Sequence, residues 1–344
     1  MRAIAIVLTL AALARPAAAF DTWWHAEATR KACEATGFSA DARLTMQVEN
    51  YLTDVLAALD VVDDDVKGML SKAGAPAVDP AYNYLHFDAV FTTKDVAHNW
   101  DQLQRNTLLT LKKYAKDASL TAEFRTIALL TVLGASLHVV QDFYSHSNWV
   151  NTWQPKGSVP LWQEIAPADR DKLDIHTGAY PDGSAPGHQN HADLNKDNSA
   201  RPLNTEGVEA ATRASIAWLK LLKDADPSLP WGEMQSYNIQ NNVVMKNYLM
   251  HLDATFLTTS SIVKHHFDGD DPKKRVFSPN DPSADMRQAA TMLTTVLGSY
   301  LTNLAQPANT FDLPSPYWVA HLHLHVSHDL AAGLMLAGKP YIKP

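Results

Sequence analysis

The sequence predicts an all-α protein. Apolar residues recur at helical spacing in several segments, strand-like alternation of apolar and polar residues is scarce, and Gly, Pro, Asn and Asp gather between the periodic segments. The chain has 344 residues, of which 46% are hydrophobic and 19% are charged. That length is sufficient for one large domain, or two modest ones, with a buried core.

Helical periodicity predicts the elements in order along the chain. The expected helices cover 24–36, 40–59, 94–116, 121–149, 205–222, 237–264 and 284–304. The Asp- and Pro-rich segment 224–230 separates the fifth helix from the sixth. Residues 153–201 form a long, irregular segment rich in Gly, Pro, Asn and Asp. A loop of that length inside a compact domain is usually functional.

The N-terminus has the pattern of a secretory signal. Arg2 supplies a positive end, 4–13 is a short apolar run, and the alanines at 17–19 form a small-residue cleavage site. We expect cleavage after Ala19, which leaves Phe20 as the new N-terminus. No other stretch is expected to reach the roughly 18 apolar residues that span a bilayer. The mature protein is therefore expected to be soluble and secreted or periplasmic.

Three parts of the chain follow from these boundaries. Residues 1–19 are the signal peptide, 20–268 form the main all-α domain, and 269–344 form a small C-terminal extension. The boundary is placed at the start of the polar, Pro-containing segment 268–283. The oligomeric state is left open by the sequence.

Charge and cysteine content narrow the function classes. The formal net charge is −8, which argues against sequence-independent binding to duplex nucleic acid because such binding needs a basic surface. Cys33 is the only cysteine, so neither an internal disulfide nor a site of several zinc-bound thiolates can form. A transition metal would have to be held by the 15 histidines and 37 acidic residues.

One helix carries ligand-type side chains at steps of four. His138, Asp142 and His146 fall within roughly 80° of one helix face, so we expect them to converge on one point, as binding of a divalent metal requires. Gly134 and Ala135 are small and leave room for ions or for a neighbouring backbone. The alternative is that these are hydrogen-bonded core residues, which is the commoner reading for a single buried histidine.

Further ligands are expected from other segments. The candidates are His25, Asp54, His86, His188 and His191. Each also has a plain structural reading. His25 would be an exposed residue at a helix start, Asp54 a solvated helix acid and His86 a buried, hydrogen-bonded histidine. The two loop histidines would lie on the surface.

Together these segments resemble the superfamily of zinc-dependent phospholipases C and single-strand nucleases, and in particular its HET-C-like, bacterial phospholipase C-like branch. The motifs that carry the resemblance are Leu137-His138-x3-Asp142-Phe-Tyr-Ser-His146-Ser-Asn-Trp149, the early His25, Asn50-x3-Asp54, His86-Phe-Asp88 and His191-x2-Leu194-Asn-Lys-Asp197. The resemblance extends over about 20–267, and the 137–149 motif is its most specific part.

The resemblance implies an all-helical domain with a cluster of about three zinc ions in a cleft. The ligands it implies are the main-chain amine and carbonyl of Phe20 and the side chains of His25, Asp54, His86, His138, Asp142, His146, His191 and Asp197. The chain departs from the better-known members in several ways. It begins with Phe rather than Trp, and the spacing from Asp142 to the next histidine, His146, is shorter than in those members. Asn195 rather than an acid follows His191 at the fourth position, so Asp193 and Asp197 are both candidates for the last ligand.

The resemblance also implies the chemistry, which is hydrolysis of a phosphodiester by metal-activated water. Asp54 would be a ligand that orients or deprotonates the water, and Asp88 would fix the tautomer of His86. The expected function is a phospholipase C that acts at a phospholipid membrane surface. The alternatives are a single-strand nuclease or nucleotidase, and a non-catalytic zinc-binding module that interacts with membranes.

Aromatic residues close to these motifs have two readings. They are Trp23, Trp24, Trp149, Trp153 and Trp162. Exposed tryptophans would favour a membrane interface or would stack on bases. The plain reading is that most of them are core aromatics.

The C-terminal extension contains a histidine-rich segment at 318–328. As a strand it would place His321, His323 and His325 on one face, and as a helix it would group His321, His325 and His328. The segment could bind a metal or lie at a subunit interface, or it could be a half-buried strand with a polar face.

Overall fold

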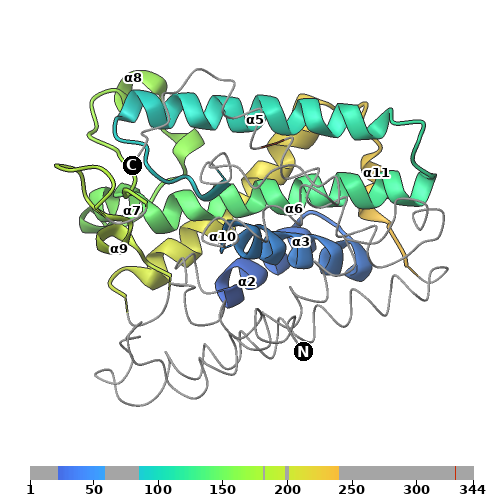
Figure 1. The fold of residues 1–344 in the computed structure, drawn as a ribbon, viewed down its shortest axis with the longest axis horizontal. Helices are drawn as coiled ribbons and strands as arrows, with labels where there is room; N and C mark the ends of the chain where they lie inside the picture. Colours follow the sequence, from blue (N-terminus) through green and yellow to red (C-terminus); the bar gives the residue numbers. More distant parts are fainter. Residues whose placement is uncertain (1–21, 59–84, 181–182, 198–200, 240–329, 331–344) are drawn as a thin grey trace, which may run out of the picture.

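The computed structural model describes residues 22–58, 85–180, 183–197, 201–239 and 330, and these residues are mostly helical with almost no strand, which confirms the predicted all-α class (Figure 1). The long helices are α2 (Thr22–Ala35), α3 (Ala40–Ala58), α5 (Thr93–Ala115), α6 (Ala122–His146) and α10 (Asn204–Ala225). The short ones are α7 (Trp149–Trp153), α8 (Pro167–Arg170), α9 (His191–Leu194) and α11 (Trp231–Gln235), with single 3₁₀ turns η3 (Gln154–Lys156) and η4 (Trp162–Glu164).

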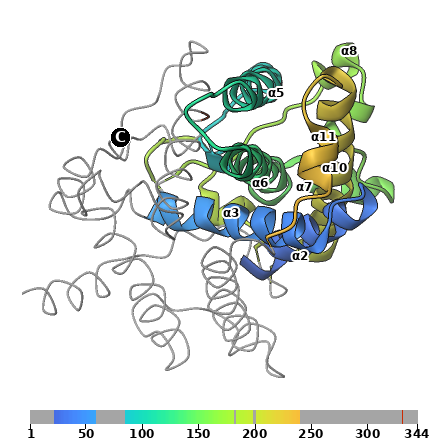
Figure 2. The same cartoon turned by 90° about the vertical axis from the view of Figure 1, so that its right-hand side faces the viewer.

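Helix α6 lies at the centre of the described part of the protein. It packs against α3, α5 and α10, and α2 packs in turn against α3 and α10. Figure 2, which looks along α6, shows α5 on one side of it, α10 on another and the pair α2 and α3 beneath. Every residue of α6 from Thr126 to His146 is buried. Polar side chains on this helix are therefore held inside the protein.

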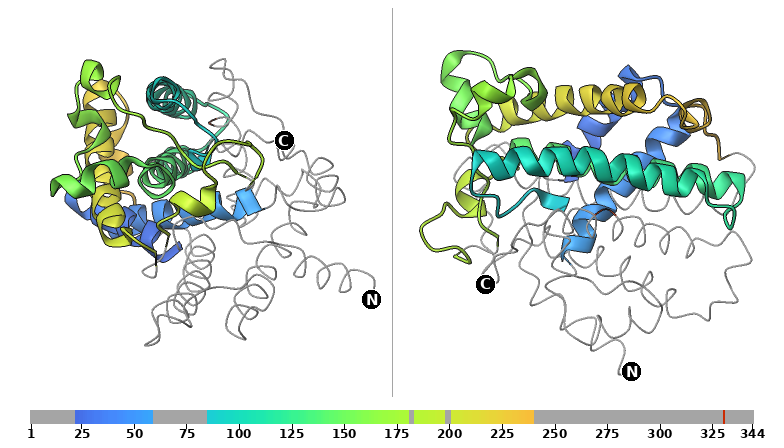
Figure 3. Two further views of the ribbon diagram at one scale, coloured as in Figure 1. Left: turned by 90° about the vertical axis from the view of Figure 1, so that its left-hand side faces the viewer. Right: turned by 90° about the horizontal axis from the view of Figure 1, so that it is seen from above.

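The short connection from α5 to α6 makes the two helices an antiparallel pair (Figures 1 and 3). Thr92 caps the start of α5 by accepting a hydrogen bond from the backbone N–H of Asp95, and Thr121 caps α6 by accepting from that of Phe124. These caps satisfy N–H groups that have no partner inside their own helix. They define where each of the two helices begins.

Among the described helices, α6 alone is long and apolar enough to cross a membrane, but its apolar part is entirely buried inside the protein. The expectation that no segment after the N-terminus has this composition is therefore wrong for α6. The reason is its central position, because a helix that is covered on all sides is apolar all round.

Helices α3 and α6 approach each other closely at Gly134. A Cβ atom at this position would lie 2.7 Å from the backbone O of Met46 and 2.8 Å from Cβ of Glu49. The small residues at 134 and 135 were expected to leave room for ions or for a neighbouring backbone. At Gly134 the backbone of α3 takes this space. The contact brings α3 against α6, the helix that carries His138, Asp142 and His146.

The expected helix bounds agree with the observed ones to within a few residues for the five long helices. The helix expected over 121–149 ends at His146, and a separate short helix, α7, follows. The helix expected from residue 237 is not formed over 237–239, which are extended or irregular. The described residues of the segment 153–201 form short helical turns and loops, and two isolated bridges, Ser147 to Thr177 and Ala179 to Asn190, involve them.

Several predictions concern residues outside the described ranges. They are the signal peptide 1–19 with Phe20, the boundary near 268, the helix over 284–304 and the histidine-rich segment 318–328. Their structures are not described, and these predictions stay as they stand.

Candidate metal centre

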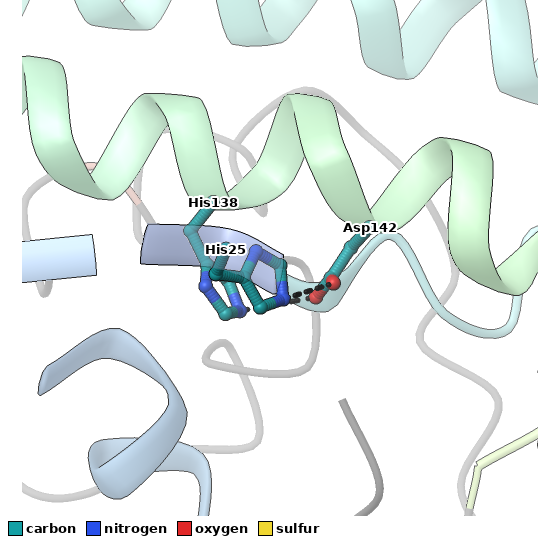
Figure 4. Close-up of side chains that lie close together, drawn as sticks. All are labelled: His25, His138 and Asp142. Atoms are coloured by element: carbon teal, nitrogen blue, oxygen red, sulfur yellow. Dashed lines mark ion pairs between the residues drawn. The ribbon is translucent and has the colours of Figure 1, made fainter. Parts of the chain in front are cut away.

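The first cluster joins α2 to α6. It consists of His25, His138 and Asp142, and one ligand atom from each lies within 4.8 Å of the others. Nε2 of His25 is 3.1 Å from Oδ1 of Asp142, and Nε2 of His138 is 3.0 Å from Oδ2 of the same carboxylate. The two imidazoles stack with centroids 4.2 Å apart. Figure 4 shows both rings turned toward the Asp142 carboxylate.

His86 adds a third imidazole to this carboxylate. Its Nδ1 lies 2.9 Å from Oδ2 of Asp142 and 3.1 Å from Nε2 of His138. His86 comes from the single turn at 85–86 that precedes α5, and it is 6% exposed. The group is therefore assembled from three separate parts of the chain and is closed to bulk water.

The second cluster lies at the C-terminal end of α6. It consists of Asp88, His146 and His191, all buried. Oδ1 of Asp88 is 3.0 Å from Nδ1 of His191 and 3.7 Å from Nδ1 of His146. On its other side, Nε2 of His146 is 3.0 Å from Oδ1 of Asp197. Oδ2 of Asp197 is buried and accepts no hydrogen bond from the residues that the structure describes.

The motif on α6 thus serves two groups rather than one. His138 and Asp142 belong to the first cluster, while His146 belongs to the second. Residues eight apart on a helix share a face but are separated by about 12 Å along its axis, because the rise is about 1.5 Å per residue. The expectation that all three side chains converge on one point was therefore wrong.

A strained segment places His86 and Asp88 against α6. The residues between and after them, Phe87 and Ala89, have φ angles of 53° and 57°. Such left-handed conformations are uncommon without glycine and, when held by the surroundings, often occur at functional sites. The backbone N–H of Ala89 donates to the carbonyl of Gly178 at 2.8 Å, which ties the segment to the irregular region.

Gly178 also positions His191. A Cβ atom at residue 178 would lie 2.4 Å from Cα and 2.6 Å from N of His191. Because these are backbone atoms, a larger residue would have to displace the start of α9. Nothing in the local sequence around Gly178 signals this contact.

In the first cluster His138 is neutral and Asp142 is ionised. Burial lowers the pKa of His138 to about 3, with the charge of Asp142 opposing the effect. Burial alone would raise the pKa of Asp142, but the imidazoles of His138, His146 and His25 hold it well below its usual range. Neutral imidazole and carboxylate are the forms that bind a metal.

The chemistry of the donor set fits a cation. A carboxylate that is completely buried needs compensating positive charge, and Asp142 is 0% exposed. Beside the second cluster, Oδ2 of Asp197 has no hydrogen-bond partner among the described residues and has the same need. Two buried groups of His and Asp side chains in this structure could therefore hold metal ions.

The structure brings together most of the residues expected at the site. His25, His86, His138, Asp142, His146, His191, Asp88 and Asp197 all lie in or beside the two clusters. Asp88, expected as a partner of His86, is itself a potential ligand beside His191. Asp54 lies on α3 one turn after Asn50, but its side chain is outside what the structure describes, as is all of Phe20.

Contacts in the irregular segment distinguish Asp193 from Asp197 and show where His188 lies. Oδ2 of Asp193 accepts from the backbone N–H of Asn190 at 3.0 Å, at the start of α9. Asp193 is thus a helix-capping residue, and Asp197 is the acid beside His146. His188 stacks on Phe91, with ring centroids 4.0 Å apart, and is exposed.

Lys196 was not expected at the site from the sequence. It is 1% exposed, and its Nζ donates to the carbonyls of Ser145, Ser147 and Leu194 at 3.2, 2.9 and 2.7 Å. Burial lowers the pKa of Lys196 to about 7. The side chain joins the C-terminal end of α6 to the segment that carries Asp197, and all three of its donor positions are used.

The tryptophans near the motifs are mainly core residues. Trp149 and Trp162 are 0% and 1% exposed, and they pack with Trp100 and Phe143. Trp24 and Trp153 are partly buried against the same core. The plain reading of these residues is therefore correct, whereas Trp23 lies where side chains are not described.

The fold and these clusters define an all-α protein with two adjacent, buried His/Asp groups that are suited to metal binding. Residues 87–178 match the family model of the VWA7 N-terminal domain, which is less than half of the chain. The match includes α5, α6 and Gly178 but not His25, His86 or His191. No curated protein matches the chain, and no solved structure does. The name of the matched domain states no reaction, so the function is argued from the side chains.

Proposed function

We propose that the two clusters bind zinc ions and that the protein is a secreted zinc-dependent phosphodiesterase, specifically a phospholipase C. The observation that carries the proposal is the meeting of buried histidines and aspartates from α2, the 85–90 segment, α6 and the α9 region in two adjacent groups. Adjacent groups of this kind are typical of sites where two or more ions act on one phosphoryl group.

Zinc follows from the type of ligand. Imidazole and carboxylate side chains suit zinc, whereas magnesium and calcium are usually bound by oxygen atoms alone. His25, His138 and Asp142 would hold one ion, and Asp88, His146 and His191 a second. His86 and Asp197 lie beside these groups and would complete them. A third ion, with Phe20 and Asp54 among its ligands, is the further expectation from the family resemblance.

When bound, zinc would supply a water molecule with a pKa of about 7 and polarise the phosphoryl oxygens. The protein's own part is to hold the ligands in place and to handle the proton. Asp54 is proposed to accept the proton of the attacking water, because it stands one turn from Asn50 on the helix that packs against α6. The surrounding core excludes bulk water from both clusters.

A lipid diester is the favoured substrate. The net charge of −8 makes a long anionic strand a poor partner for the protein as a whole. Lys196, the buried cation next to Asp197, is bonded to three backbone carbonyls and is therefore not available to bind a phosphate. A compact headgroup diester needs less basic surface than a polynucleotide does.

The test is hydrolysis by the purified mature protein. Vesicles of phosphatidylcholine, single-stranded DNA and single-stranded RNA are offered separately, before and after removal of metal with a chelator and after zinc is added back. We expect zinc-dependent release of phosphocholine from the vesicles. We expect Asp54→Asn to lower the rate by 100-fold or more, roughly the contribution of a general base.

Each other outcome has a defined meaning. Zinc-dependent cleavage of the single strands without lipid turnover would establish the nuclease alternative and reject the lipase. Zinc binding without hydrolysis of any of the three would leave a non-catalytic zinc module. Full activity of Asp54→Asn would reject the proposed role of that residue. Asp169→Asn, an exposed acid on α8, is the matched control.

A further inference from the structure

We propose that Ser215, Gln141 and Asn50 are positioning residues that fix the ring tautomers of His25 and His138, so that both histidines turn an Nε2 lone pair toward Asp142. The inference rests on the proposed function for its purpose, namely metal binding at the first cluster. Its geometry rests only on hydrogen bonds between described residues. All three positioning residues are completely buried, and they come from α10, α6 and α3.

Ser215 fixes which groups donate and which accept in the network of hydrogen bonds around Gln141. The hydroxyl of Ser215 donates its one proton to the backbone carbonyl of Ala211 at 2.8 Å. Its oxygen can therefore only accept from Gln141, whose Nε2 lies 3.0 Å away. The NH₂ group of Gln141 must face Ser215, and its Oε1 must face the opposite way.

The orientation of the Gln141 amide in turn fixes the tautomer of His25. Oε1 of Gln141 lies 2.6 Å from Nδ1 of His25. Because a carbonyl oxygen only accepts, Nδ1 of His25 has to carry the proton. In the neutral ring the lone pair is then on Nε2, the atom that lies 3.1 Å from Oδ1 of Asp142.

The orientation of the Asn50 amide fixes the tautomer of His138 in the same way. Its Nδ2 donates to Oε1 of Gln141 at 3.1 Å, so its Oδ1 faces Nδ1 of His138 at 3.0 Å. The proton of His138 is thus also on Nδ1, and its Nε2 lies 3.0 Å from Oδ2 of Asp142.

The amide of Gln141 has all its hydrogen-bonding positions filled. Its NH₂ group donates to Ser215 and Thr29, and its oxygen accepts from Asn50 and His25. Thr29 also accepts from Asn50, at 3.0 Å. A buried network that is fully satisfied resists rotation of either amide, because a flip would leave buried donors facing donors.

The result is a cluster in which acceptors face acceptors. Two Nε2 lone pairs and two carboxylate oxygens lie about 3 Å from one another, with Nδ1 of His86 beside Oδ2 of Asp142 and Nε2 of His138, an arrangement that a bound cation would stabilise. Partners that hold the remote ring nitrogen are a general feature of metal-binding histidines. Here one network holds two rings and links them to the relative placement of four helices.

The experiment reads the proton positions directly. Two-bond ¹H–¹⁵N correlation spectra of the metal-free protein, labelled on histidine, report which ring nitrogen carries the proton, and His25→Gln and His138→Gln assign the signals. We expect an Nδ1 proton on both residues in the wild type. A neutral ring with its proton on Nε2 at either residue would overturn the proposal. This readout needs neither bound metal nor activity.

Paired variants separate positioning from packing. Gln141→Met keeps the approximate shape but removes the acceptor, so we expect the proton of His25 to move to Nε2 and zinc affinity to fall about 10- to 100-fold. Gln141→Glu restores an acceptor for His25 and should keep the proton on Nδ1 and bind zinc more tightly than Gln141→Met. Equal affinity of the two variants, with unchanged spectra, would show a merely structural role.

Thr131→Val is the control for loss of a buried polar group on α6, because that hydroxyl bonds only the carbonyl of Ile127 among described residues. Should Gln141→Met fail to fold, the wild-type spectrum still decides the matter. If the wild type shows both Nδ1 protons but binds no zinc, the proposed function fails while the tautomer assignment stands.

Discussion

Nε2 of His25 lies 3.1 Å from Oδ1 of Asp142, although α3 and α5 stand between the two residues in the sequence. The contact joins α2 to the central helix at the point where two further imidazoles reach the same carboxylate. A second group of the same chemical type forms about one turn after Asp142 on α6, around His146.

Loss of one cluster should leave the other able to bind. We expect the wild type to bind at least two zinc ions per chain, His138→Ala to lose the ion of the first cluster, and His191→Ala to lose that of the second. Metal analysis after exhaustive dialysis measures the stoichiometry. His176→Ala, which removes a partly buried histidine bonded to Gln189 outside both groups, should change nothing. Loss of all metal in both single variants would mean one cooperative site instead.

Removal of metal should lower the stability of the fold. An ion that binds only the folded state stabilises it by about 2.7 kcal/mol at a free concentration of 100 times Kd. Thermal unfolding should therefore occur at a lower temperature after chelation and recover when zinc is added. An unchanged midpoint across a thousandfold range of free zinc would contradict metal binding by the buried groups.

Gly178→Ala should disrupt the second cluster selectively. The new methyl group would overlap backbone atoms of His191, which lie only 2.4 and 2.6 Å from its position, so α9 must move. We expect a loss of about 1–3 kcal/mol of stability, as for other overpacked sites, together with one equivalent of zinc. Urea denaturation and metal analysis measure the two effects.

Gly207→Ala is the matched control for that variant, because a Cβ atom there meets its neighbours at 3.5 Å or more. Since alanine favours a helix over glycine, this control should be neutral or slightly more stable. A Gly178→Ala protein with full metal content and wild-type stability would show that His191 is positioned in some other way.

Gly134→Ala should weaken the contact between α3 and α6. Its Cβ atom would lie 2.7 Å from the carbonyl oxygen of Met46, a backbone atom, so the helices must separate. We expect a loss of about 1–3 kcal/mol in free energy of unfolding. Because Asn50 lies on α3, zinc affinity should fall as well. Gly232→Ala, at a helical glycine with nothing within 4 Å, should show neither change in urea denaturation or zinc titration.

Cys33 should be unreactive in the folded protein. It is completely buried against Met46, and burial raises the pKa of its thiol to about 12. We expect no reaction with a thiol reagent at pH 8 until a denaturant unfolds the chain, and one thiol per chain afterwards. Rapid labelling of the native protein would contradict the packing of α2 against α3.

The raised pKa of the Cys33 thiol also affects the stability of the protein at high pH. The folded-state pKa of Cys33 lies above the ordinary value of 9.0, so the unfolded chain loses the proton first. The contribution of the Cys33 thiol to the free energy of unfolding is fully present below pH 9. It should decline by about 1.4 kcal/mol per pH unit as the pH rises toward 12. Cys33→Ala should lack this contribution, which chemical denaturation at a series of pH values would show as a shallower decline.

Local pattern accounts for what the sequence could predict. Apolar periodicity placed the five long helices to within a few residues, because both the pattern and the helix are local properties of the chain. The same geometry placed His138, Asp142 and His146 on one face. The candidate ligands His25, His86 and His191 were found by residue type and motif, and the structure brings all of them to α6.

What the sequence by itself determined is thus an all-α chain with ligand-type residues on one helix face. Only the tertiary structure decided that these residues divide into two clusters, that Asp197 rather than Asp193 stands beside His146, and that Gln141 and Asn50 control the histidine tautomers. The reason is physical. A contact between side chains from distant segments depends on how helices pack and on which glycines let backbones approach, and neither leaves a periodic trace in the sequence.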